Sequence, residues 1–237
     1  INIKKKICIC FYGLTRSLKY THSSIKNRIL KILILNNYYV DIYLHTYDLN
    51  IINNKRSGEL NVKLNLDEYK LLNPDYVSIT SQSDFDNSIN INNFLSKGDP
   101  WPDNPKISLL NLLRQLNSLK IVTKMHEEKD YNCYIYLRPD LKYLNNLNIK
   151  LIDNLKTDTF YTPNWGKFGG LNDRFGIGCK DVMIKFGYRI DKALEYSKIN
   201  SLHSEKFLKY IMNNYEKNNI QLKAYRVRAN GKISKDC

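Results

Sequence analysis

The pattern of apolar and polar positions predicts strands and helices that alternate along the first 140 residues. Continuous apolar runs at residues 7–12 and 134–137 are typical of strands buried on both faces. Apolar residues spaced three and four apart predict helices over residues 20–35 and from 105 to about 128. Further strands are expected at residues 39–46 and 76–80. Because strand–helix–strand units cross over with one hand, this order predicts parallel strand pairs.

The rest of the chain is less regular. Short strands are predicted at residues 149–152, 159–162 and 222–227, and helices at residues 67–72, 180–197 and 203–218. Residues 51–65 are polar and predict a loop, and residues 81–105, rich in Ser, Asn, Asp and Pro, predict a long one. No repeat or linker divides the 237 residues. We expect one α/β domain built on a Rossmann-like, mixed and mainly parallel sheet flanked by helices.

The net charge of the chain does not by itself identify a binding partner. The chain carries 37 Lys and Arg against 23 Asp and Glu, a formal charge of +14. A polyanionic partner such as nucleic acid, an anionic membrane surface or a phosphate-bearing substrate would explain that charge. Asn, Lys, Ile and Tyr are over-used throughout, however, as in an AT-rich coding genome, and the lysines are not interleaved with aromatic residues. No nucleic-acid partner is therefore expected.

The cysteines and the length of the apolar stretches indicate the cellular compartment of the protein. The five cysteines are odd in number and lack the spacing of a zinc knuckle or a redox dithiol. Cys8 and Cys10 lie two apart on a predicted strand and are expected to be small core residues. No stretch reaches the ~20 apolar residues of a transmembrane helix. These features predict a cytoplasmic protein without a transmembrane segment.

Several common chemistries lack their signatures. The sequence contains no GxGxxG, no GxxxxGK[ST] and no GxSxG, which argues against a dinucleotide fingerprint, a P-loop and an α/β-hydrolase elbow. The four histidines have no metal-ligand spacing, so a zinc hydrolase is disfavoured.

Polar residues follow the predicted strands at the points where these end, and such ends meet at one edge of a parallel sheet. The residues concerned are Gly13, Thr15, Arg16, Asp48, Arg138 and Asp140. A guanidinium beside a helix start, as at Arg16, suits a phosphate. A carboxylate at Asp140 can hold a divalent cation between phosphate oxygens. Pro-Asp is equally ordinary turn chemistry, and that alternative stays open.

Three later segments add candidates. The glycine-rich run WGKFGGLNDRFGIG carries Asp173 and Arg174, where an Asp could bind or deprotonate a ligand hydroxyl or simply pair with the Arg. Arg114 and Ser118 lie four apart on the long helix and so share a face, but Arg114 could equally face solvent. Glu205 opens a helix, either as part of an acidic first turn or as a ligand-binding group.

At this point the chain resembles a known family. The segments CFYGLTRSLKYTHSSI, IYLHTYD, LLRQLNSLKIVTKM, YIYLRPDL, GGLNDRFGIG, SEKFLKYIM and RVRANG follow the same order as in GT-A-type glycosyltransferases of giant DNA viruses and bacterial surface-polysaccharide gene clusters. RPDL and NDRFGIG are the most specific pieces, and the resemblance covers nearly the whole chain.

The resemblance implies a GT-A fold, with a nucleotide-sugar half over about residues 1–140 and an acceptor half over about residues 141–237. It implies a nucleotide-diphosphate donor, a UDP-sugar above all, a glycan or glycoprotein acceptor, and Mn²⁺ or Mg²⁺ bound at Asp140. Gly13, Thr15, Arg16, Asp48, Arg114, Ser118 and Arg138 would bind the donor, and Arg174 and Glu205 the acceptor. Asp173 would be the catalytic base.

One departure weakens the metal prediction. Arg138-Pro139-Asp140 stands where the family has a DxD motif, so only one carboxylate remains, and Arg138 could itself supply positive charge to the leaving diphosphate. Three alternatives stay open: a catalytically weak sugar-nucleotide-binding relative, a nucleotidyltransferase, and a basic nucleic-acid-binding module.

Overall fold

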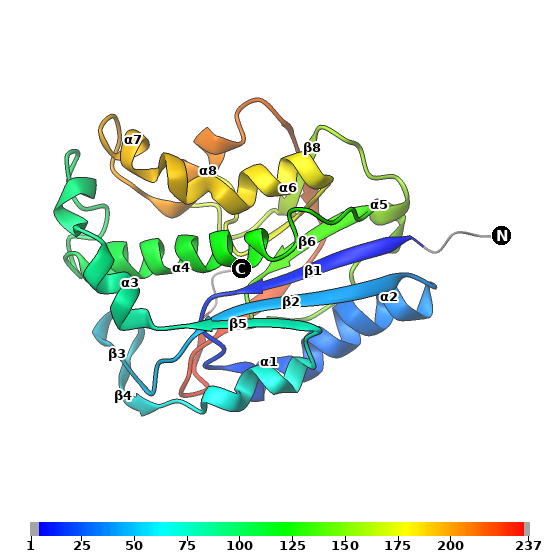
Figure 1. Ribbon diagram of the computed structural model, residues 1–237, viewed down its shortest axis with the longest axis horizontal. Helices are drawn as coiled ribbons and strands as arrows, with labels where there is room; N and C mark the ends of the chain where they lie inside the picture. The colour runs from blue at the N-terminus through cyan, green and yellow to red at the C-terminus, as the bar shows by residue number, and fades with distance from the viewer. Residues whose placement is uncertain (1–4, 235–237) are drawn as a thin grey trace.

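A seven-stranded sheet forms the centre of the molecule in the computed structural model, which describes residues 5–234 (Figure 1). The strand order is β10-β8-β9-β6-β1-β2-β5. These strands are β1 (Lys6–Tyr12), β2 (Tyr39–Tyr47), β5 (Tyr76–Thr80), β6 (Cys133–Leu137), β8 (Thr159–Pro163), β9 (Phe175–Gly178) and β10 (Glu216–Ile220). Only β9 runs antiparallel to its two neighbours. The predicted mixed, mainly parallel sheet in a single α/β domain is confirmed.

Strand β1 divides the core into two parts, because its residues alternate between the faces of the sheet. Cys8, Cys10 and Tyr12 contribute to one apolar cluster, and Ile7, Ile9 and Phe11 to the other. All these side chains are fully buried, as the continuous apolar run predicts.

Helices cover both faces (Figure 1). The face with Ile7, Ile9 and Phe11 packs against α1 (Leu18–Ile25), the π-helical turn η1 (Lys26–Leu30) and α2 (Lys31–Leu35). The face with Cys8, Cys10 and Tyr12 packs against α4 (Ile107–Lys124), α6 (Lys180–Gly187), η5 (Tyr188–Lys192), α7 (Ala193–Ser197) and α8 (Ser204–Ile211). No helix in the described part of the chain is long and apolar enough to cross a membrane.

Two small sheets stand outside the central one. The polar segment 51–65, predicted as a loop, is instead the hairpin β3 (Ile51–Asn54) and β4 (Glu59–Lys63), joined through η2 (Lys55–Ser57). The second contains β7 (Leu141–Tyr143), β11 (Ala224–Val227) and β12 (Ile233–Ser234). The predicted closing strand therefore exists as β11, but it pairs with β7 and not with the central sheet.

Other boundaries also differ from prediction. The segment predicted as a strand at 149–152 is helix α5 (Ile149–Asp153), whose first turn is capped by the Asn148 side chain. The helix predicted to reach residue 218 ends at Ile211, and β10 follows. The long loop before α4 holds α3 (Gln82–Ser88) and η4 (Ile91–Phe94), and the helix before β5 is the 3₁₀ segment η3 (Leu66–Leu72).

Candidate active site

A cavity of about 540 Å³ opens where β1 and β6 end. Its lining comes from the segments after those strands, the β3–β4 hairpin, α4, the glycine-rich segment, the start of α8 and β11. The structure thus brings together at one sheet edge eight of the residues singled out from the sequence. They are Gly13, Arg16, Arg114, Arg138, Asp140, Asp173, Arg174 and Glu205.

The other three predicted donor residues are not in the cavity lining. Asp48 is exposed, and its Oδ1 accepts the Gln82 N–H at 3.1 Å. Ser118 is buried, and its Oγ accepts the Gly13 N–H at 2.7 Å. The Thr15 carbonyl accepts the Leu18 N–H at 3.1 Å. Ser118 and Thr15 thus hold the turn that follows β1.

The turn at Gly13 needs glycine, because its φ of +96° is strained for other residues. Its N–H is engaged by Ser118 and so does not point a free donor at a ligand. Arg16, three residues on, does line the cavity, and its Nη1 lies 3.3 Å from Glu59 Oε2.

The Arg138-Pro139-Asp140 turn is held by a bidentate ion pair. Arg138 donates from Nε to Asp140 Oδ1 at 3.0 Å and from Nη2 to Asp140 Oδ2. Asp140 is 3% exposed. Burial alone would raise its pKa, but the Arg138 and Arg16 guanidinium groups lower the pKa to about 2. Asp140 is therefore ionised under all ordinary conditions.

A hydrogen-bond chain joins this turn to Asp173. Arg138 Nη1 donates to Gln115 Oε1 at 3.0 Å, and Gln115 Nε2 donates to Asp173 Oδ2 at 3.0 Å. Ser204 Oγ also donates to Asp173 Oδ2. Within the described residues, the buried Asp173 Oδ1 has no hydrogen-bond partner. Gln115, on the same helix as Arg114, is thus the link between the two candidate carboxylates.

Asp173 and Glu205 have pKa values pushed in opposite directions. Burial would raise the pKa of Asp173, but Arg174, Arg138, the Ser204 hydroxyl and Arg189 hold it well below its usual range. Burial, together with the charge on Asp173, raises the pKa of Glu205 to about 8, although Arg174 opposes the shift. Asp173 is a permanent anion, whereas Glu205 exchanges a proton near neutral pH.

Glu205 contacts two basic side chains. Arg174 Nη2 lies 3.5 Å from its Oε1, and His203 Nδ1 lies 3.3 Å from its Oε2. Burial and the Lys206 charge lower the pKa of His203, so this imidazole is neutral near pH 7 and adds little charge. Arg174 therefore pairs with Glu205, and Glu205 is more than a member of an acidic first turn.

Arg114 lines the cavity but is already paired. It donates from Nε and Nη2 to the two Asp86 carboxylate oxygens at 2.8 and 2.6 Å, and from Nη1 to Asn111 at 2.8 Å. Asp86 lies on α3, inside the segment predicted as a loop. Arg114 therefore ties α3 to α4 at the cavity wall.

Four other charged residues at the site are not among those predicted from the sequence. Arg56, Arg226 and Arg228 line the cavity, and buried Glu59 accepts the Ala229 N–H at 2.8 Å beside Arg16. Arg226 and Arg228 are two apart, a spacing that puts both side chains on the same side of an extended segment. This spacing is the sequence pattern from which a shared position at the site could be predicted for the two arginines.

Arginine is concentrated in the cavity to an unusual degree. The chain has nine arginines and 28 lysines. Seven arginines line the cavity: Arg16, Arg56, Arg114, Arg138, Arg174, Arg226 and Arg228. No lysine of the described residues lines it. Three carboxylates share the lining, so the cavity is strongly positive.

The surroundings of Asp140 do not fit Mn²⁺ or Mg²⁺. Such ions need several oxygen ligands, but both oxygens of Asp140 already accept N–H groups from Arg138. Within residues 5–234, the one group of three or more His, Cys, Asp or Glu side chains close enough to share a metal is Cys8, Cys10 and His126. The donor set around Asp140 fits guanidinium groups.

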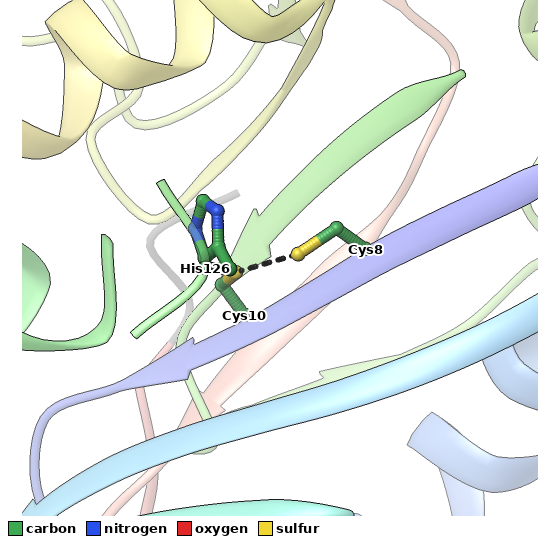
Figure 2. A group of neighbouring side chains, drawn as sticks. All are labelled: Cys8, Cys10 and His126. Atoms are coloured by element: carbon green, nitrogen blue, oxygen red, sulfur yellow. Dashed lines mark hydrogen bonds between the residues drawn. The ribbon is translucent and has the colours of Figure 1, made fainter. Parts of the chain in front are cut away.

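The Cys8, Cys10 and His126 cluster lies in the core and not in the cavity (Figure 2). The two Sγ atoms are 3.4 Å apart, and His126 Nε2 is 2.6 Å from the Tyr136 hydroxyl. Thiolates and imidazole suit Zn²⁺ or Cu⁺, but all three side chains are closed to solvent. The prediction of small core residues is confirmed for both cysteines. Cys133 and Cys179 are also free thiols, and Cys237 lies outside the described residues.

No model of a known protein family matches the chain, and no curated protein is significantly similar to it in sequence.

Proposed function

We propose that the chain is a GT-A-type glycosyltransferase that moves a sugar from a nucleotide-diphosphate donor, a UDP-sugar above all, to a hydroxyl of a glycan or protein-linked acceptor. One observation carries the proposal: a single cavity joins an arginine cluster with two carboxylates of opposite pKa shift. Arginine suits a diphosphate because its planar fork matches phosphate oxygens.

The sheet and the source of the lining residues agree with this proposal. A mixed, mainly parallel sheet is the architecture that the resemblance implies. Gly13, Arg16 and Arg138 come from the proposed nucleotide-sugar half, and Asp173 and Glu205 from the proposed acceptor half. Arg226 and Arg228 also come from the second half, so the phosphate-binding side of the cavity draws on both.

The chemistry needs one bond made, one broken and one proton removed. The acceptor oxygen attacks the anomeric carbon, and the bond from that carbon to the diphosphate oxygen breaks. The electron pair leaves with the diphosphate, and the hydroxyl proton passes to a base. Arginine charge beside the leaving group stabilises the transition state.

The pKa shifts favour Glu205 over Asp173 as that base. A catalytic base works best with a pKa near the working pH, which holds for Glu205 at about 8 and fails for Asp173. The free Oδ1 of Asp173 would instead accept the hydrogen bond of the acceptor hydroxyl and orient it. The expected catalytic role of Asp173 is thereby changed from proton acceptor to hydroxyl-binding anion.

A donor panel tests the proposal. The full chain is incubated with UDP- and GDP-sugars, and the released phosphate species is identified. A glycosyltransferase releases a nucleoside diphosphate, and a nucleotidyltransferase would release pyrophosphate. Donor binding without any turnover would indicate a catalytically weak relative, and failure of every nucleotide-sugar to bind would end the proposal.

A further inference from the structure

We infer that guanidinium groups alone bind the diphosphate, with no divalent cation, and that Asp140 and Glu59 hold these arginines in place. The inference rests on the proposed function for the identity of the ligand. Its structural basis lies in the contacts of the two buried carboxylates, in the residues that share the cavity wall, and in the balance of charge there.

Each of the two carboxylates holds arginines. Asp140 accepts hydrogen bonds from Nε and Nη2 of Arg138, and Arg16 Nη2 lies 4.0 Å from the same carboxylate. Glu59 Oε2 lies 3.3 Å from Arg16 Nη1 and 4.0 Å from Arg228 Nη1. Arg16 thus bridges the two anions. Two carboxylates fix three guanidinium groups, which leaves an excess of positive charge.

Glu59 has further contacts that fix its position. It is fully buried, its Oε1 accepts the Ala229 N–H, and its Oε2 accepts the Ser57 hydroxyl. The β3–β4 hairpin therefore supplies a counter-charge to arginines of two other segments. A buried carboxylate occupied in this way is unsuited to coordinate a hydrated metal ion.

Crowding of the arginines favours an anionic ligand. Burial, reinforced by the positive charges of Arg138, Arg228 and Arg174, lowers the pKa of Arg226 to about 9. A dication would add to this repulsion, whereas the negative charges of a diphosphate would relieve it. The cavity is arranged for a polyanion before any ligand enters.

The decisive experiment is calorimetric titration of the full wild-type chain with UDP and with inorganic pyrophosphate, in EDTA and then in Mn²⁺. We expect both ligands to bind in EDTA, with Kd values within fivefold of those in Mn²⁺. Binding that requires Mn²⁺, or tightens fivefold or more with it, would overturn the inference.

An Asp140→Asn variant gives a second measurement. If Asp140 only positions Arg138, its substitution changes pyrophosphate affinity by the same factor in EDTA and in Mn²⁺. If Asp140 binds a metal, the variant instead loses a Mn²⁺-dependent part of the affinity. Thermal unfolding checks that the variant is folded, and if it is not, the wild-type titrations decide.

The two proposals can fail separately. Pyrophosphate binding in EDTA without any nucleotide-sugar binding would leave the arginine site standing and refute the transferase. Sugar transfer that depends on Mn²⁺ would support the transferase and refute the metal-free arginine site.

Discussion

The cavity and the outer surface carry the same sign of charge through different residues. Seven of nine arginines line the cavity, whereas none of the lysines that the structure describes does. Six of the seven cavity arginines are at least partly buried, and Arg138 forms an ion pair with Asp140, whereas Arg56 is exposed. Surface pairs such as Lys192–Glu195 have both side chains well exposed.

The difference separates a compositional effect from a functional one. An AT-rich coding sequence would account for lysines spread over a surface, where one flexible ammonium serves as well as another. It does not account for arginines gathered at one site, where the planar fork and permanent charge of guanidinium matter. The net charge of +14 is therefore a poor guide to the partner, and the distribution of arginine is a better one.

The largest effect is expected from Glu205→Gln, with the exposed Glu195→Gln as the matched control. Loss of a positioned base should lower the transfer rate by about 10²–10⁴-fold, while calorimetry should show donor affinity unchanged. Glu195→Gln, on the surface, should leave the rate unchanged.

The pH profile of that rate identifies the base. Wild-type transfer should increase as pH rises through about 8, the pKa of Glu205. Asp173→Asn should be slow but keep this rise, and Glu205→Gln should lack it. A rise that survives in Glu205→Gln and disappears in Asp173→Asn would reverse the two assignments.

The next effect contrasts a cavity arginine with a surface lysine. Arg228→Met should weaken UDP binding roughly tenfold or more, because a charge-assisted hydrogen bond contributes about 1.5–3 kcal/mol. Lys142→Met, at an exposed position on the neighbouring strand β7, removes the same charge and should change the Kd less than twofold. Equal losses from the two variants would show that overall charge, and not the cavity, attracts the ligand.

The smallest effect concerns stability. The pKa of Glu205 in the folded chain, about 8, exceeds the usual 4.5, so the folded state holds its proton more tightly than the unfolded state does. Stability from this group is fully present below pH 4.5 and is lost as pH rises through 8. The free energy of unfolding of Glu205→Gln should therefore rise relative to that of wild type by at least about 1 kcal/mol between pH 5 and pH 8.5. This corresponds to roughly 2–4 °C in Tm. A constant Tm difference across that range would count against the raised pKa.

The strongest periodic segments of the sequence predicted the fold well. Strands β1, β2, β5 and β6 and helix α4 were identified because burial on one or both faces leaves a pattern in the sequence. The β3–β4 hairpin was missed because its strands are polar, and α5 because a short apolar run fits either state.

Candidate site residues were predictable where a strand end marked them. Arg16, Asp140 and Asp173 line one cavity, as their positions after or before strands suggested. The sequence does not mark Glu59 and Arg56 as site residues, because they belong to a polar hairpin whose pattern predicts a loop. The opposite pKa shifts of Asp173 and Glu205 depend on tertiary neighbours such as Arg138 and Arg174, which sequence spacing does not reveal.

Gly170 has a consequence for tracing the ancestry of this chain. A Cβ atom there would lie 1.9 Å from the backbone oxygen of Glu205, and the neighbouring Leu171 N–H donates to that same oxygen at 3.0 Å. Two backbones meet with no room for a side chain, so mutation at this position cannot be absorbed by a rotamer change. Divergent descendants that keep the Glu205 region in place should retain glycine here long after the surface has changed beyond recognition.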